Sequence, residues 1–98
     1  MNMKSPNNFS SPGSGEPQAP DVVLRAEGLF CPIPIARATE RMASMRAGEI
    51  LEIRATDPGV IIDIPAWCHS ASLEFMGYER EGGVIVSRVR RPIPGAPA

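Results

Sequence analysis

The residues most able to do chemistry lie between positions 28 and 34, where the sequence GLFCPIP carries one thiol, Cys31. This stretch follows a β-like run and opens a helix-like one, so the thiol should stand at the beginning of a helix. A helix N-terminus has four amide donors without intrahelical partners, and its aligned peptide dipoles act as about half a positive charge. Both features favour the thiolate, which is the nucleophilic form of cysteine, over the thiol.

Two prolines define the position of Cys31 relative to that helix. Proline is tolerated in the first turn of a helix, and it disfavours the α conformation for the residue before it. We therefore predict that Cys31 lies near the N-cap position, with Pro32 and Pro34 inside the first turn. Gly28 can turn the chain sharply out of the preceding strand. The same pattern also fits a plain strand-to-helix loop with a half-buried cysteine, because free cysteine often behaves as a small hydrophobe.

The second cysteine, Cys68, is predicted to face the core from a later helix, and the alternative is that it acts as a resolving or second reactive thiol. His69 is the only histidine and is expected at the surface. The adjacent Cys68 and His69 do not have the spacing of zinc ligands, so no metal site is predicted. There is no C-x-x-C motif, which argues against a thioredoxin-type dithiol.

The 98 residues carry a net charge of −1, with acidic and basic side chains interspersed. This balance argues against direct DNA binding, which usually needs a basic face. No apolar run approaches the roughly 18 residues of a membrane span, and no apolar segment follows Lys4 as in a secretory signal. We expect a cytoplasmic monomer in which both cysteines remain free thiols.

Composition divides the chain into three parts. Residues 1–20 are mostly Asn, Ser, Pro and Gly, and we predict a disordered extension because they cannot bury enough apolar surface. Residues 92–98 resemble them and are predicted to be a flexible tail. The remaining residues, 21–91, are enough for one domain with a single two-layer core.

Hydrophobic patterns predict a strand–helix–strand unit in the first half of the domain. A strand of about five residues begins at Val22 and ends before Gly28. Residues 32–47 should form a helix ended by Gly48, and residues 49–55 alternate as a second strand. The two strands should be parallel and joined by a right-handed crossover. The apolar stripe of the helix consists of Ile35, Ala38, Met42 and Met45.

A second helix is predicted to start at Asp57 and Pro58, and to end at Gly77. Pro65 should kink or restart this helix, with Asp63 as a cap of the restarted part. Its apolar face is expected to consist of Val60, Ile64, Trp67, Cys68, Ala71 and Phe75.

The Gly82-Gly83 pair predicts a hairpin between strands at residues 78–81 and 84–90. The basic end of the last strand, residues 88–91, could contact phosphates or could simply protect the sheet edge. Arg37 and Arg41 are four residues apart and share one face of the first helix. They form either a basic patch for an acidic partner or RNA, or an ordinary solvated face.

The element order βαβαββ, with a Gly-Leu-x-Cys-Pro-x-Pro turn before the first helix, resembles the TusA family of sulfur carriers, also called SirA-like. The resemblance covers about residues 22–91. Its residues are Leu24, Gly28, Leu29, Cys31, Pro32, Pro34, Gly48, Asp57, Pro58 and the run DIPAWC at residues 63–68.

The resemblance implies an α+β two-layer sandwich, with two helices on one face of a four-stranded mixed sheet. It implies that Cys31 carries sulfur as a covalent persulfide, with no other cofactor, and that Gly28, Leu29, Pro32 and Pro34 position the thiol. The sulfur would come from a cysteine desulfurase or a rhodanese-like donor and pass to an acceptor protein. End uses in the family include tRNA thiolation, molybdenum-cofactor maturation and sulfur oxidation. Partner-binding candidates are Arg37, Arg41 and Asp63.

The sequence departs from the family pattern in three places. Arg25 stands where an Asp is frequent, Ser72-Leu73 replaces a frequent Gly-His, and residues 1–20 lie outside the family core. Two other functions remain open. One is a regulatory interaction module that uses the same surface without sulfur transfer, and the other is a redox protein that uses both Cys31 and Cys68.

Overall fold

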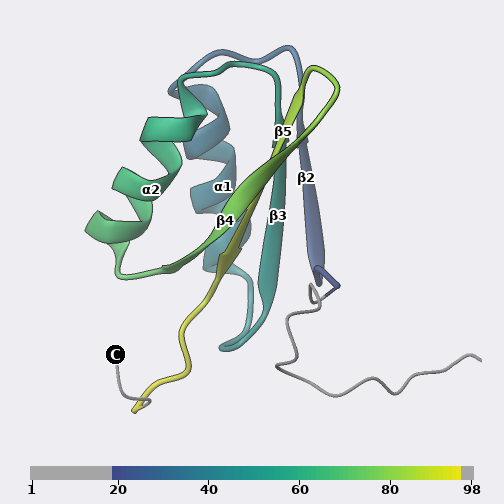
Figure 1. The fold of residues 1–98 in the computed structure, drawn as a ribbon. Helices are drawn as coiled ribbons and strands as arrows, with labels where there is room; N and C mark the ends of the chain where they lie inside the picture. The colour runs from purple at the N-terminus through teal and green to yellow at the C-terminus, as the bar shows by residue number, and fades with distance from the viewer. Residues whose placement is uncertain (1–18, 96–98) are drawn as a thin grey trace, which may run out of the picture.

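The computed structural model describes residues 19–95, which form two layers, a four-stranded sheet and two helices on one of its faces (Figure 1). The elements in chain order are β2 (Val22–Ala26), α1 (Ile33–Ala43), β3 (Ile50–Ala55), α2 (Val60–Ala71), β4 (Glu74–Glu81) and β5 (Val84–Arg90). The predicted order βαβαββ and the two-layer α+β class are therefore confirmed. No helix in this part of the chain is long and apolar enough to cross a membrane.

The sheet has the strand order β2-β3-β5-β4. Strands β2 and β3 are parallel, while β5 runs antiparallel to both of its neighbours. The parallel pair places the carboxyl ends of β2 and β3 at the same end of the sheet. The loops that leave those ends, before α1 and before α2, therefore lie next to each other (Figure 1).

The core lies between the helices and the sheet. Strand β3 is central and buried, because its helix-side residues Leu51, Ile53 and Ala55 are fully enclosed. The predicted stripe of the first helix is confirmed at Ala38 and Met42, which are buried, and Ile35 packs beside them. The second helix contributes Val60, Ile64 and Cys68 to the same core.

The first helix ends earlier than the sequence predicts. It stops at Ala43 rather than near residue 47, because the N–H and the hydroxyl of Ser44 both bond to the carbonyl oxygen of Arg41, at 3.1 and 3.0 Å. Met45 lies in the loop that follows the helix, and its side chain is buried. Gly48 does not end the helix; its N–H donates to the carbonyl oxygen of Arg91 at 2.6 Å.

The second helix also ends earlier, at Ala71, and continues through Pro65 as one element, so the predicted restart is wrong. Ser72 adopts a left-handed conformation with φ of 59°. The N–H of Leu73 then bonds to the carbonyl oxygen of Cys68 at 2.8 Å, which satisfies the last turn. The chain leaves the helix five residues before Gly77.

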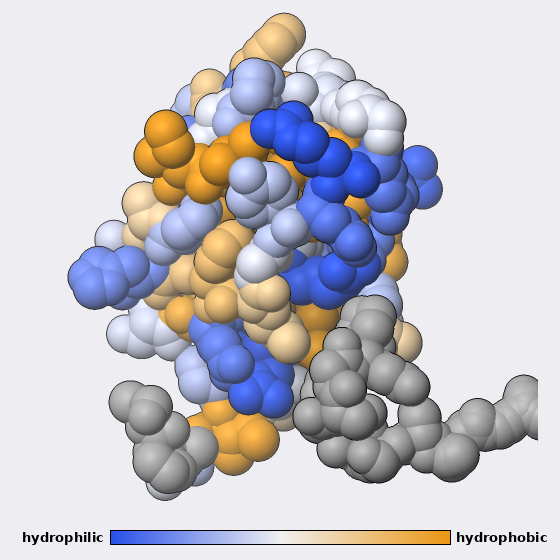
Figure 2. All heavy atoms as spheres, in the orientation of Figure 1, coloured by the Kyte–Doolittle hydropathy of each residue, from blue (hydrophilic) through white to orange (hydrophobic). Residues whose placement is uncertain are grey.

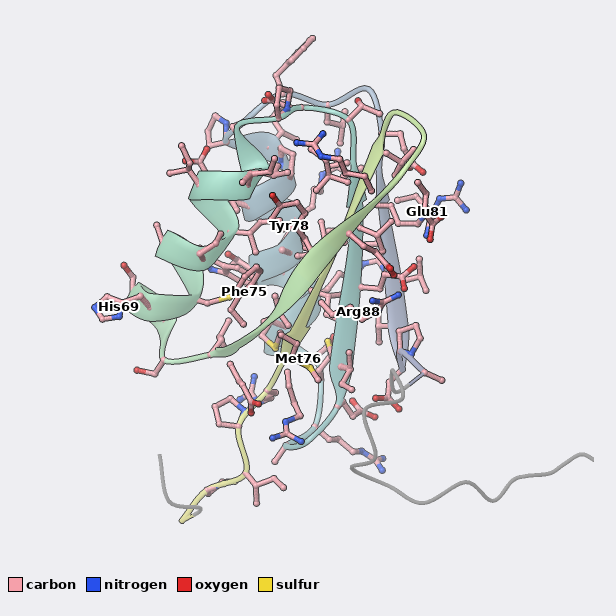
Figure 3. All side chains as sticks on the ribbon, viewed as in Figure 1. His69, Phe75, Met76, Tyr78, Glu81 and Arg88 are labelled. Atoms are coloured by element: carbon pink, nitrogen blue, oxygen red, sulfur yellow. The ribbon has the colours of Figure 1, made fainter. Side chains whose placement is uncertain are left out.

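Phe75 consequently belongs to β4, and its assignment to the second helix is wrong. It pairs with Val89 of β5 and points toward α2 (Figure 3). Gly77 has φ of +97° and lies inside β4, where the register with β5 shifts between Phe75 and Tyr78. A bulge of this kind favours glycine because side chains rarely adopt that conformation. The hairpin at residues 82–83 is confirmed.

The left-handed Ser72 leads to a stability prediction. We expect Ser72→Gly to raise the free energy of unfolding by about 0.5–1 kcal/mol, because glycine has no Cβ to strain in this conformation. Ser70→Gly, inside the same helix, should instead lower it by roughly 0.5 kcal/mol. Urea unfolding followed by circular dichroism measures both variants. A Ser72→Gly protein no more stable than the original would contradict this description of the helix end.

Ion pairs cover the helix-free face of the sheet. Arg54 reaches Glu52 at 3.0 Å and Glu81 at 2.6 Å. Arg88 reaches Glu52 at 3.3 Å and Glu79 at 3.0 Å. Figure 3 shows Glu81 and Arg88 on the side of the sheet away from the helices. The basic end of the last strand is thus partly neutralised by carboxylates, which disfavours phosphate binding. Its predicted role in edge protection is wrong, because β5 lies between β3 and β4.

Candidate functional site

Cys31 lies in the loop between β2 and α1, at the end of the molecule where the two parallel strands finish. Cys31 lies one residue before the predicted N-cap position, because Pro32 is the N-cap of α1. Pro34 lies in the first turn and is buried. The side chain of Cys31 is only partly exposed and packs against the core beside Leu29.

The neighbouring loop between β3 and α2 holds the cysteine loop in place. The carboxylate of Asp57 accepts a hydrogen bond from the backbone N–H of Cys31 at 2.9 Å and another from Gly59 at 3.0 Å. The hydroxyl of Thr56 accepts one from the N–H of Gly28 at 2.9 Å. Gly28 has φ of +81°, which supports its predicted role in the turn. The bonds from Gly28 and Cys31 connect the two loops across more than twenty residues of sequence.

Two carboxylates face the thiol. The pKa of Cys31 is raised to about 12, first by burial, next by a hydrogen bond to Asp63 and the charge of Asp63, and then by Asp57. The backbone N–H groups of Cys31 and Gly59 hold the pKa of Asp57 below its ordinary value. In the free protein Cys31 is therefore a protonated thiol at neutral pH, and the predicted preference for the thiolate is wrong.

The physical reason lies in the first turn of α1. Pro32 and Pro34 have no N–H, and the N–H of Ile33 already donates to the carbonyl oxygen of Phe30 at 2.9 Å. Most of the four N-terminal positions of α1 therefore have no free N–H to donate to an anion. Burial, together with the carboxylates of the opposite loop and of α2, then keeps Cys31 protonated.

The structure separates the other candidate residues. Asp63, in the first turn of α2, is the only one of the three partner-binding candidates beside the thiol. Arg37 and Arg41 are exposed on α1 and form no ion pair with residues 19–95. His69 points away from the body of the molecule (Figure 3). No cluster of His, Cys, Asp and Glu that could hold a metal ion occurs in the described part of the chain.

Cys68 is buried in the core, which confirms the prediction that it faces the core. Both cysteines are free thiols. Burial raises the pKa of Cys68 to about 11. It lies five residues beyond Asp63 along α2, which is roughly 7.5 Å further from the cysteine loop. A buried thiol at that position is poorly placed to exchange with Cys31, which disfavours the two-cysteine redox alternative.

The sequence analysis missed what Thr56 and Asp57 do for the thiol. It treated Asp57 only as the start of a helix with Pro58 at the first helical position. Asp57 does accept a hydrogen bond from the N–H of Gly59, but Gly59 is the N-cap and the helix begins at Val60, so the predicted start is wrong. The signal that could have revealed the second role is topological. Loops that leave the carboxyl ends of adjacent parallel strands meet at one end of the sheet, so polar residues there lie near each other.

Comparisons with known proteins fit this geometry. The family model described as "Sulfurtransferase TusA" matches residues 23–91, which include both loops of the site. The chain belongs to the TusA family. This confirms the resemblance and supports a role in sulfur transfer in general.

Relatives in the TusA family carry matching names. YrkF of Bacillus subtilis (strain 168), a candidate sulfur carrier protein, is 44% identical over 70 residues, which is 71% of this chain but only 38% of YrkF. The sulfur carrier protein TusA of Allochromatium vinosum is 41% identical over 63 residues, covering 64% of this chain and 83% of that protein. The crystal structure of a SirA-like protein from Desulfitobacterium hafniense has the same fold, with a TM-score of 0.65 at 22% identity, over 74% of this chain and 99% of that one.

Proposed function

We propose that this protein is a sulfur carrier that holds sulfane sulfur as a persulfide on Cys31 and passes it to an acceptor protein. The observation that carries the proposal is the position of Cys31. Of the two cysteines among the described residues, Cys31 is the one that is partly exposed. It lies in the loop that joins the end of β2 to the two prolines at the start of α1. Its loop is fixed by Asp57, and the residue is only partly buried.

The transfer step follows from thiol–disulfide chemistry. The Cys31 sulfur attacks the outer sulfur of a persulfide on a donor cysteine, so that a new S–S bond forms as the S–S bond of the donor breaks. The electron pair of the broken bond leaves with the donor sulfur, which takes up the proton lost by Cys31. No net oxidation occurs, and no cofactor is needed. In a second step of the same kind, the thiol of an acceptor attacks the outer sulfur of the Cys31 persulfide and releases the Cys31 thiol.

The raised pKa of Cys31 favours one alternative, an interaction module that uses the same surface without transferring sulfur. A thiol that stays protonated is a weak nucleophile. This alternative predicts that Cys31→Ser keeps every partner, whereas a carrier loses its function with that sulfur. The donor proposed for the carrier is a cysteine desulfurase or a rhodanese-like protein.

Intact mass measures the difference directly. The full chain is incubated with a cysteine desulfurase and cysteine, as the original protein, as Cys31→Ser and as Cys68→Ser. We expect a gain of one sulfur atom that disappears only in Cys31→Ser. No gain with any of several sulfane donors would refute the carrier and favour the interaction module. A gain that is lost in both variants would indicate a two-cysteine mechanism.

A further inference from the structure

Exposed apolar side chains surround the thiol. Phe30, which precedes Cys31, is 73% exposed, and Ile33 at the start of α1 is 44% exposed. Ile62, which precedes Asp63 in the first turn of α2, is 74% exposed. Figure 2 shows hydrophobic surface over the first turn of α2, at the end of the molecule that carries the cysteine loop. Large apolar side chains grouped around a reactive centre are typical of a protein-binding surface.

The centre of this surface is acidic. Asp57 and Asp63 both face the thiol, and neither forms an ion pair with Lys or Arg among residues 19–95. Arg54 and Arg88 of the sheet are instead engaged with glutamates on its helix-free face. The surface therefore offers two uncompensated carboxylates inside an apolar rim, and a complementary partner must supply the positive charge.

Resting on the proposed function, we propose that this surface selects its sulfur donor by charge and by apolar contact. It fits a protein that presents an apolar patch and a Lys or Arg side chain next to its persulfide. Small anionic donors such as thiosulfate or free polysulfide are disfavoured, because they approach the carboxylates with the same sign of charge. The partner's cation pairs with Asp63 and so compensates the negative charge that faces the thiol.

Four short synthetic peptides test this selection without any natural partner. Each contains one cysteine activated as a 2-pyridyl disulfide, flanked either by Lys or by Glu, and either by Leu or by Ser. The Cys31 sulfur forms a disulfide with the peptide sulfur as the S–S bond to the pyridyl group breaks. The released 2-thiopyridone takes up the proton lost by Cys31 and is followed by absorbance. Intact mass and peptide mapping locate the product on Cys31.

We expect the original protein to react with the Lys peptides about ten-fold faster than with the Glu peptides at low salt, and high salt should reduce this ratio. In Asp63→Asn the ratio should fall to within about two-fold. Ile62→Ser should keep the charge preference but lose most of the preference for Leu over Ser. Glu40→Gln removes an exposed carboxylate of α1 and should change neither ratio. Ratios within one variant cancel changes in overall reactivity.

A Lys-to-Glu ratio near one in the original protein overturns charge selection. A ratio that persists in Asp63→Asn overturns the role of Asp63, and an unchanged Leu preference in Ile62→Ser overturns the role of the apolar rim. None of these results affects the sulfur gain measured by intact mass. The proposed function and this inference therefore fail separately.

Discussion

Replacing Asp63 with Asn should speed the alkylation of Cys31 by iodoacetamide about three-fold near neutral pH. The carboxylate raises the pKa of Cys31 through a hydrogen bond and through its charge, and asparagine lacks that charge. A lower pKa increases the thiolate fraction ten-fold per pH unit, while the nucleophilicity of each thiolate falls by only about half of that on a logarithmic scale. Because the folded-state pKa is raised, the rate of the original protein should still be rising well above pH 9.

The measurement is a series of alkylation rates against pH, with the label located by peptide mapping so that Cys68 does not contribute. Glu40→Gln is the matched control, since it removes a carboxylate that does not face the thiol. The advantage of Asp63→Asn should shrink as the pH rises, and once both thiols are ionised the original protein should react faster, because a thiolate of higher pKa is more nucleophilic. A slower reaction in Asp63→Asn near neutral pH would mean that Asp63 acts as a base toward Cys31 rather than as a negative charge that retains its proton.

Ile53→Ala should lower the free energy of unfolding by about 2–5 kcal/mol. Ile53 is fully buried at the centre of β3, between β2 and β5 and under the helices. The substitution removes apolar contacts and leaves a cavity that the surrounding sheet fills only in part. A domain of this size is stable by only about 0.05–0.15 kcal/mol per residue, so this loss is a large share of the total.

Urea unfolding by circular dichroism measures the effect, with Val23→Ala as the control. Val23 lies on the edge strand β2 and is 41% exposed, so its truncation should cost less than about 1 kcal/mol. Equal losses in the two variants would contradict the central position of β3 in the core.

Local residue preferences predicted the first half of the domain closely. The alternation of apolar and polar residues and the presence of β-branched residues predicted β2 and β3. The spacing of Ala38 and Met42 predicted the buried side of α1. The stretch from Ser72 to Gly77 was predicted wrongly because two patterns overlap there. Phe75 continues a helical apolar spacing, yet it enters the core from β4, and Gly77 suits a bulge as well as a helix end. Local spacing cannot distinguish these cases.

The sequence by itself determined the element order, the placement of a thiol before a helix, and the membership of a sulfur-carrier family that its Cys-Pro-x-Pro turn indicates. The protonation state of that thiol was decided only by the tertiary structure. Asp57 and Asp63 are 26 and 32 positions after Cys31 in the chain, and the parallel pairing of β2 with β3 brings their loop and helix against it. Electrostatic interactions depend on distance in space, so a motif read along the chain could not include them.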